Sequence, residues 1–214
     1  MHNITQLLTN NQRWAARMTA EEPAFFQRLA AQQTPAYLWI GCSDSRVPAT
    51  QLVELPPGEM FVHRNVANLV VHSDLNCLAV LQYAVEVLAV EHIIICGHYS
   101  CGGVEAVLHN RSFGLIDNWL RHVHDVAAKH AHLLSVCRDD AQRFQRLCEL
   151  NVIEQVVNVC RTTIVQGAWQ RGQALAVHGW IYGLRDGLLR DVGMTITQSR
   201  DLALQYEQAL ARIT

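Results

Sequence analysis

Two short segments of this chain place groups that can bind a metal directly after apolar runs. Residues 38–46 read LWIGCSDSR, so an apolar run and a glycine precede Cys42. Residues 93–101 read IIICGHYSC and carry His98 and Cys101 after a second apolar run. Such runs are typical of strands buried on both faces of a parallel sheet, and ligands bind where those strands end. We therefore expect the two thiols and the imidazole to lie close together.

Cys42, His98 and Cys101 together form the ligand set of a zinc site, because zinc prefers thiolate sulfur and imidazole nitrogen in tetrahedral geometry. Three protein ligands leave a fourth position for water, substrate or Asp44, which is typical of a catalytic rather than a structural site. His98 and Cys101 alone would more often be ordinary core residues. Cys42 at the end of a matching strand is what favours the metal.

Asp44 and Arg46 lie two residues apart, so in an extended chain they share one face. A guanidinium beside a carboxylate keeps it ionised and orients it through a directional hydrogen bond. An ordinary ion pair at a strand end is one interpretation. Beside a metal, the pair predicts a two-state switch: Asp44 held by Arg46 leaves the fourth position open, and Asp44 released from Arg46 closes it as the fourth ligand.

The composition is that of a soluble protein with a large core. Hydrophobic residues make up 50% of the 214 residues and charged residues 17%, against about 25% charged in typical soluble domains. Surface hidden in a subunit interface would also account for this low fraction of charged residues. The formal net charge of -2 gives no indication of nucleic-acid binding. The sequence begins without a signal peptide and contains no apolar segment of about 18 residues, so we expect a cytoplasmic protein with no membrane span.

The alternation of apolar runs and helical patterns predicts the α/β class: a mostly parallel central sheet, about four parallel strands plus an antiparallel edge strand, flanked by helices. We expect one domain over residues 1–214, with an N-terminal helical arm at 1–34, an α/β core at 35–193 and a C-terminal helix at 194–214. The arm has no obvious place in the sheet, so we expect it to pack on a partner subunit.

Strands are expected at 35–41, 59–64 with an extension over 67–71, 91–96, 174–182 and 188–192. Helices are expected at 3–18, 22–32, 49–54, 75–90, 101–108, 115–136, 140–169 and 199–212. Cysteines outside the zinc set, such as Cys77, Cys148 and Cys160, are interpreted as small core residues. Histidines such as His63 and His130 lack ligand spacing with a cysteine and are interpreted as packing or surface residues.

Three motifs in order, CSDSR at 42–46, FVHRNVAN at 61–68 and GHYSCGG at 97–103, closely resemble the β-class carbonic anhydrases. The likeness runs from about Gln33 to Tyr182. The resemblance implies a zinc lyase that catalyses the reversible hydration of CO2 to bicarbonate and a proton by zinc-bound hydroxide.

The resemblance assigns one Zn²⁺ per subunit to Cys42, His98 and Cys101, and the catalytic dyad to Asp44 and Arg46. Asp44 would accept a hydrogen bond from the hydroxide, and Arg46 would hold Asp44 in place. Two thiolates cancel the zinc charge, so we expect a less acidic water than in a three-histidine enzyme and activity that favours higher pH.

The resemblance also implies an apolar CO2 pocket whose walls come partly from a neighbouring subunit. We therefore expect a homodimer as the minimum unit and a homotetramer as the assembly. Gln33 matches the position that donates a hydrogen bond to substrate oxygen, and backbone N–H groups at a helix start could orient ligands. The pocket residues implied are Gln33, Phe61, Val66, Tyr83, Gly102 and Gly103.

Trp39, Arg64 and Tyr182 match the trio that binds bicarbonate away from the catalytic route in the bacterial bicarbonate-regulated (type II) subclass. Without the resemblance, each would be expected to pack or to form an ion pair. With it, we expect allosteric inhibition, in which bicarbonate stabilises the state with Asp44 on zinc.

Two alternatives stay open at this point. One is a hydrolase of a CO2-like substrate, carbon disulfide or carbonyl sulfide, on the same scaffold and with the same ligands. The other is a non-enzymatic zinc-binding protein, which requires a fourth protein ligand in every condition.

Overall fold

The structure, a computed structural model, describes residues 3–213 and divides into two compact units between Thr34 and Pro35. Residues 1–2 and 214, the ends of the predicted domain, lie outside the described residues. Within the described part of the chain, no helix has both the length and the apolar character needed to cross a bilayer.

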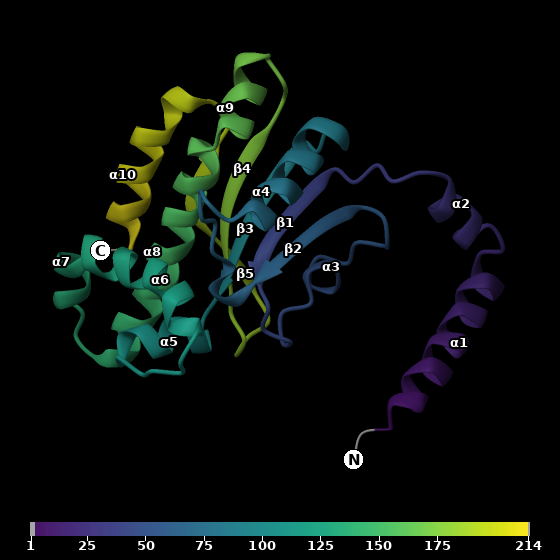
Figure 1. Ribbon diagram of the computed structural model, residues 1–214, viewed down its shortest axis with the longest axis horizontal. Coiled ribbons are helices and arrows are strands. Elements are labelled where there is room, and N and C mark those ends of the chain that lie inside the picture. Colours follow the sequence, from purple (N-terminus) through teal and green to yellow (C-terminus); the bar gives the residue numbers. More distant parts are fainter. Residues whose placement is uncertain (1–2, 214) are drawn as a thin grey trace. The chain divides into compact units, whose positions relative to one another are not determined.

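The N-terminal unit consists of two helices, α1 at Ile4–Glu21 and α2 at Phe25–Ala31 (Figure 1). The side chain of Asn3 caps α1 by accepting a hydrogen bond from the Thr5 N–H at 3.0 Å, which satisfies a backbone donor that the first turn leaves unpaired. The aromatic side chain of Trp14 makes edge-to-face contacts with rings on α2. No described residue of α1 is buried, so its apolar side chains lack a core of their own.

The second unit is built on a five-stranded sheet with the order β2-β1-β3-β4-β5. The first four strands are mutually parallel, and β5 pairs antiparallel with β4 at one edge. This confirms the predicted α/β class and its antiparallel edge. The strands are β1 at Tyr37–Cys42, β2 at Met60–Asn65, β3 at His92–His98, β4 at Ala176–Tyr182 and β5 at Leu189–Ile196.

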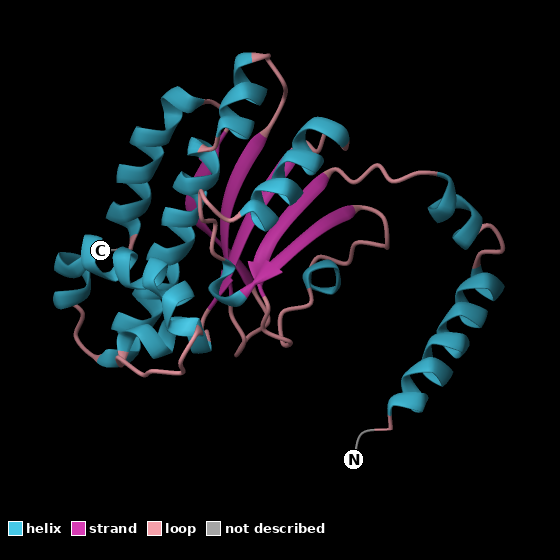
Figure 2. Cartoon of the chain, in the orientation of Figure 1, coloured by secondary structure: helices cyan, strands magenta, loops and turns pink. Residues whose placement is uncertain are grey.

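Helices flank the sheet, as Figure 2 shows. The longest of them, α8 at Asp140–Arg161, packs on β3, β4 and β5. The others are α3 at Ala49–Leu52, α4 at Leu75–Gln82, α5 at Gly102–Leu108, α6 at Ile116–Lys129, α7 at Ala131–Ser135, α9 at Thr163–Gln170 and α10 at Leu202–Arg212, with short helical turns η1 at Val66–Asn68, η2 at Tyr83–Val87 and η3 at Ser199–Asp201.

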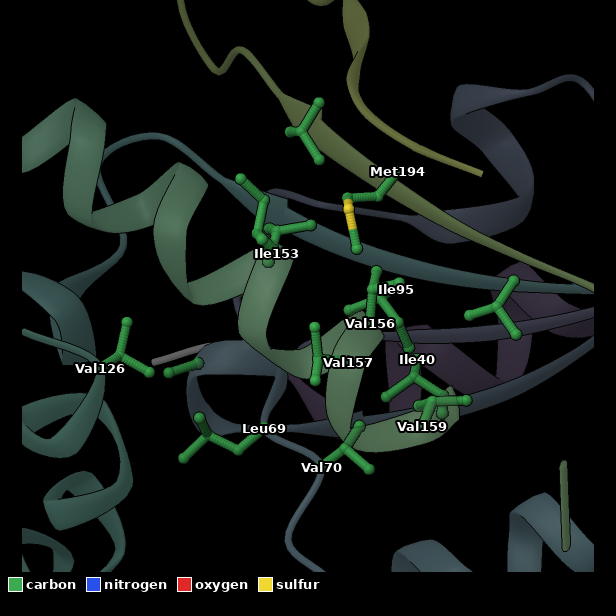
Figure 3. Close-up of a cluster of buried hydrophobic side chains, with 14 of the residues drawn as sticks. Ile40, Leu69, Val70, Ile95, Val126, Ile153, Val156, Val157, Val159 and Met194 are labelled. Atoms are coloured by element: carbon green, nitrogen blue, oxygen red, sulfur yellow. The ribbon is translucent and has the colours of Figure 1, made fainter. Parts of the chain in front are cut away.

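Alternation along the strands sorts their side chains into two apolar clusters. On β1, Leu38 and Ile40 face the large cluster, where Ile153 and Val156 of α8 pack against the sheet (Figure 3). Trp39, between them in sequence, faces a smaller cluster on the other side. Burial on both faces is why these strands read as continuous apolar runs.

The predicted strand extension over residues 67–71 is wrong. Residues 66–68 form a single helical turn, and Ala67 and Asn68 adopt left-handed backbone angles, with φ of 65° and 48°. Two consecutive left-handed residues cannot continue a strand, so the chain leaves the sheet at Asn65.

Two predicted long helices are interrupted. The helix expected over 115–136 breaks at His130, and the one expected over 140–169 breaks at Thr162. At the second break the Thr162 hydroxyl accepts a hydrogen bond from the Val165 N–H at 3.3 Å and so caps a new helix. The helix expected over 75–90 ends at Gln82 and continues as the wider turn η2.

Candidate metal centre

The three predicted zinc ligands come together at the carboxyl ends of two neighbouring strands. Cys42 ends β1 and His98 ends β3, while Cys101 directly precedes α5. The two sulfurs and one imidazole nitrogen all lie within 4.8 Å of one another, and all three residues are buried. The Sγ atoms of Cys42 and Cys101 are 3.9 Å apart, close to the roughly 3.8 Å that two sulfurs at about 2.3 Å from a tetrahedral zinc would have.

A backbone carbonyl sets the tautomer of His98. Its Nδ1 lies 3.0 Å from the carbonyl oxygen of Tyr99, which can only accept, so Nδ1 carries the hydrogen and Nε2 keeps its lone pair. That Nε2 is buried and has no hydrogen-bond partner among the described residues. A buried imidazole nitrogen without a partner is costly unless a ligand satisfies it, and a metal between the two thiols would do so.

The thiols of Cys42 and Cys101 lie within hydrogen-bond distance of each other. Hydrogen bonding from Cys101, with a smaller effect of His98, overcomes burial and lowers the pKa of Cys42 to about 4. The same hydrogen bond and burial raise the pKa of Cys101 well above its ordinary value. Binding a divalent cation would displace protons and stabilise both thiolates. The donor set therefore fits zinc.

The Asp44 carboxylate accepts three hydrogen bonds from Arg46. Its Oδ1 accepts from the backbone N–H and the Nε of Arg46, each at 2.9 Å, and its Oδ2 accepts from Nη2 at 2.7 Å. These hydrogen bonds hold the pKa of Asp44 well below its usual range. Asp44 Oδ2 also lies 3.7 Å from the Nε2 of His98, so an ionised, oriented carboxylate faces the ligand group.

The predicted bicarbonate trio divides into two environments. Trp39 and Tyr182 belong to the smaller buried cluster, and the Trp39 indole covers Gly41 so closely that any Cβ at that position would clash with it. Arg64 instead hydrogen-bonds the backbone of residues 42–44. Its Nε donates to the carbonyl oxygen of Cys42 at 2.9 Å, and its Nη2 donates to that of Asp44.

Four of the predicted pocket residues contact one another in pairs within the second unit. The rings of Phe61 and Tyr83 lie 5.8 Å apart between centroids. Val66 Cγ1 lies 3.2 Å from the position that a Cβ on Gly103 would occupy, so a larger residue there would have to displace the Val66 side chain by a few tenths of an ångström. Gly102 begins α5. Gln33 belongs to the N-terminal unit.

A second group with ligand atoms, His63, Asp74 and Cys77, also lies within 4.8 Å of one another. Two of its members already have hydrogen-bond partners: Asp74 caps α4 by accepting from the Asn76 N–H, and His63 Nε2 lies 3.3 Å from Asn65 Nδ2. Burial raises the pKa of Cys77 to about 12. The group is a packed cluster. Asp74 and Cys77 lie three residues apart at the start of α4, but His63 comes from β2, so the grouping was not visible in the sequence.

A buried Cys–His–Cys set beside an oriented carboxylate, at the ends of parallel strands, defines a metalloenzyme centre of the α/β class. The family model for carbonic anhydrase matches residues 37–189 of this chain. The chain belongs to the β-class carbonic anhydrases, a family of zinc enzymes. Both the predicted family and the predicted cofactor are confirmed.

Relatives and solved structures agree with this assignment. A carbonic anhydrase of Emericella nidulans is 47% identical over 189 residues, which span 88% of this chain and 83% of that protein. The Coccomyxa β-carbonic anhydrase, solved with acetazolamide, superposes with a TM-score of 0.89 at 41% identity and 97% and 96% coverage of the two chains. A tetrameric β-carbonic anhydrase of Sordaria macrospora gives 0.85 at 37% identity and 90% and 98% coverage.

Proposed function

We propose that this chain hydrates CO2 reversibly to bicarbonate and a proton, with zinc bound by Cys42, His98 and Cys101. The observation that carries the proposal is the buried Nε2 of His98, unpartnered among the described residues, beside two thiols whose sulfurs lie 3.9 Å apart. Zinc held there would act as a Lewis acid and lower the pKa of a water so that a nucleophile exists near neutral pH.

Asp44 and Arg46 are proposed as the catalytic dyad. Asp44 stays ionised because Arg46 donates three hydrogen bonds to it, so it can accept a hydrogen bond from the reacting water and orient that water. Arg46 acts by keeping the carboxylate in place. The apolar surfaces of Phe61, Val66 and Tyr83 suit CO2, which carries no charge to anchor.

The dyad is also proposed as a gate. Asp44 Oδ2 is 3.7 Å from His98 Nε2, so one side-chain rotation away from Arg46 would bring the carboxylate to the ligand group as a further ligand. In the structure Asp44 is paired with Arg46. The rotation would sacrifice those hydrogen bonds, which favours the paired state unless another ligand compensates.

Inhibition by bicarbonate at Trp39, Arg64 and Tyr182 is a separate proposal, as is membership of the bacterial regulated subclass. It is supported by the hydrogen bonds from Arg64 to the carbonyls of Cys42 and Asp44, because an anion that drew Arg64 away would loosen the backbone beneath the dyad. Trp39→Phe or Tyr182→Phe should weaken bicarbonate inhibition. Inhibition constants equal to those of the wild type in both variants would contradict the proposal.

Stopped-flow CO2 hydration, with zinc content measured on the same samples, tests the main proposal. Cys42→Ala should lose both metal and activity, whereas Asp44→Ala should keep the metal and lose most of the activity. Cys160→Ala is the matched control, because Cys160 is also buried but burial raises its pKa to about 12. Zinc-loaded protein that releases sulfide from carbon disulfide or carbonyl sulfide, but does not hydrate CO2, would favour the alternative substrate.

The working assembly and location are also proposals. The exposed apolar side chains of α1 support a homodimer in which this helix packs on a partner subunit, and two such dimers would make the homotetramer. We propose a cytoplasmic location, which the seven free cysteines support because thiols persist in reducing compartments.

A further inference from the structure

The η1 turn is held by side chains from three other parts of the second unit. Trp119 on α6 donates from Nε1 to the carbonyl oxygen of Val66 at 2.8 Å. Asn151 on α8 donates from Nδ2 to the carbonyl oxygen of Ala67 at 2.9 Å. The Asn65 side chain brackets Leu69 by hydrogen bonds at 2.7 Å to its N–H and its carbonyl oxygen. The carbonyl groups of Val66, Ala67 and Leu69 and the N–H of Leu69 are therefore all paired with side chains.

The α8 contribution is a ladder of three amides one helical turn apart, which places them on one face of the helix. Gln155 Nε2 donates to Asn151 Oδ1 at 3.1 Å, and Gln155 Oε1 accepts from the Val70 N–H at 2.8 Å. Asn158 donates to the carbonyl oxygen of Val70 at 3.0 Å. Asn151 and Gln155 are 1% and 2% exposed, so these hydrogen bonds form where water cannot replace them.

The turn needs such support because its backbone is strained. Ala67 and Asn68 are both left-handed, and at Ala67 the Cβ comes unfavourably close to the following carbonyl oxygen in that conformation. A buried amide donor that satisfies the Ala67 carbonyl helps to offset this cost. Without it, the turn would relax toward the extended backbone that the sequence pattern predicts for residues 67–71.

The turn lies between the two segments that carry His98 and Cys101. Val66 Cγ1 and Ala67 Cβ lie 3.2 and 3.5 Å from the position of a Cβ on Gly103, two residues after Cys101, and Asn68 Oδ1 lies 3.4 Å from that position on Gly97, next to His98. A displaced turn would therefore move the Val66 wall of the proposed CO2 pocket relative to the metal centre.

We propose that Asn151 is a positioning residue for CO2 hydration: through its hydrogen bond to Ala67 it sets the place of Val66 in the pocket wall. This inference rests on the proposed function. It concerns the pocket and not the metal, because Asn151 contacts neither thiol nor imidazole in any hydrogen bond described for it.

Asn151→Asp tests the inference with almost no change in shape. The new carboxylate still accepts from Gln155 but places an oxygen, not a donor, against the Ala67 carbonyl. Gln166→Glu is the matched control, because Gln166 Nε2 donates to the backbone carbonyl of Cys160 at 2.6 Å, far from η1 in the chain. Both variants lose one amide-to-carbonyl hydrogen bond.

In stopped-flow assays, Asn151→Asp should lower kcat/KM by about tenfold to a hundredfold, the range that a small misplacement of a reacting group produces. It should lower kcat less and keep full zinc content, while Gln166→Glu stays near the wild type. If Asn151 only stabilises the fold, both variants should lose thermal stability and have similar kcat/KM values. That result would overturn the inference. So would loss of activity only in proportion to lost zinc.

Trp119→Phe provides a second, milder variant if Asn151→Asp does not fold. It removes the hydrogen bond to the Val66 carbonyl, keeps an aromatic ring and should show the same selective fall in kcat/KM. Unchanged kcat/KM in this variant would overturn the inference. Failure of the proposed function is distinguishable, because then the zinc-loaded wild type itself would not hydrate CO2.

Discussion

At the scale of single residues, the centre depends on which polar atoms are left without a partner. The Nδ1 of His98 is hydrogen-bonded to a backbone carbonyl, and its Nε2 has no hydrogen-bond partner among the described residues. The Nε2 of His63 lies within hydrogen-bond distance of Asn65. Both histidines have a cysteine close by. The free lone pair, together with a thiol of lowered pKa at Cys42, distinguishes a metal centre from a packed cluster.

The geometry of the Asp44–Arg46 pair predicts that lysine cannot replace Arg46. Lysine keeps the positive charge but cannot donate two parallel hydrogen bonds to one carboxylate. Arg46→Lys should keep its zinc and lose about tenfold or more in kcat/KM, measured by stopped-flow. Arg143→Lys is the control, because Arg143 pairs with Asp140 on the surface of α8. Equal kcat/KM in the two variants would show that orientation of Asp44 is unimportant.

Metal removal should destabilise the wild type through the same three ligands. A metal bound only by the folded state adds to the free energy of unfolding in proportion to the logarithm of its concentration over its dissociation constant. Chelation should therefore lower the melting temperature of the wild type and of Cys160→Ala, measured by calorimetry. Cys42→Ala should melt at the same temperature with and without chelator; a shift as large as that of the wild type would place the metal elsewhere.

At the scale of secondary-structure elements, a buried carboxylate on α8 ties neighbouring helices together. Glu154 Oε1 lies 2.7 Å from both His130 Nε2 and the Tyr206 hydroxyl, and Oε2 lies 2.8 Å from Lys129 Nζ. These residues come from the end of α6 and from α10. Although burial alone would raise it, the hydrogen bonds from His130, Lys129 and Tyr206 lower the pKa of Glu154 to about 2.

This network predicts an acid-sensitive contribution to stability. The folded pKa of about 2 lies below the ordinary value of 4.5, so the stabilisation is present above pH 4.5 and is lost as the pH falls toward 2. Glu154→Gln should be less stable near neutral pH, by up to roughly 3 kcal/mol, and should lose less on acidification. Urea unfolding across pH measures both. Asp140→Asn, at an exposed pair, should keep the wild-type pH dependence; the same dependence in Glu154→Gln would contradict the assignment.

At the scale of the whole molecule, α1 carries an apolar stripe that the described residues of its own unit do not cover. Ile4, Leu7 and Leu8 are 74%, 60% and 68% exposed, and they recur at the spacing of one helix face. Apolar side chains this exposed indicate an interaction surface. A partner subunit is the occupant that the proposed homodimer assigns to this stripe.

A charge on that stripe should weaken assembly. Leu7→Glu and Leu8→Glu would bury a carboxylate against apolar surface in the oligomer, which is strongly unfavourable, so sedimentation velocity should show a shift toward smaller species. Gln6→Glu adds the same charge at a neighbouring, polar position of α1 and should leave the distribution unchanged. Wild-type sedimentation for both leucine variants would exclude α1 from the interface.

The convergence of Cys42, His98 and Cys101, the pairing of Asp44 with Arg46 and the α/β class could be predicted from the sequence because each depends on local order. Cys42 and His98 directly follow apolar runs, and a run buried on both faces forms a strand whose end carries the next polar side chain. Strands alternating with helices leave few topologies other than a mostly parallel sheet.

Only the tertiary structure decided the turn at residues 66–68, the residues that pack around His63 and the hydrogen-bond partners of Asn151. In the sequence, residues 67–71 are apolar enough for a strand, but an amide 84 residues further along the chain binds the Ala67 carbonyl and helps to hold a left-handed turn. Hydrogen bonds between distant buried groups outweigh local preference there, because an unpaired backbone group in the core costs more than backbone strain that is well supported.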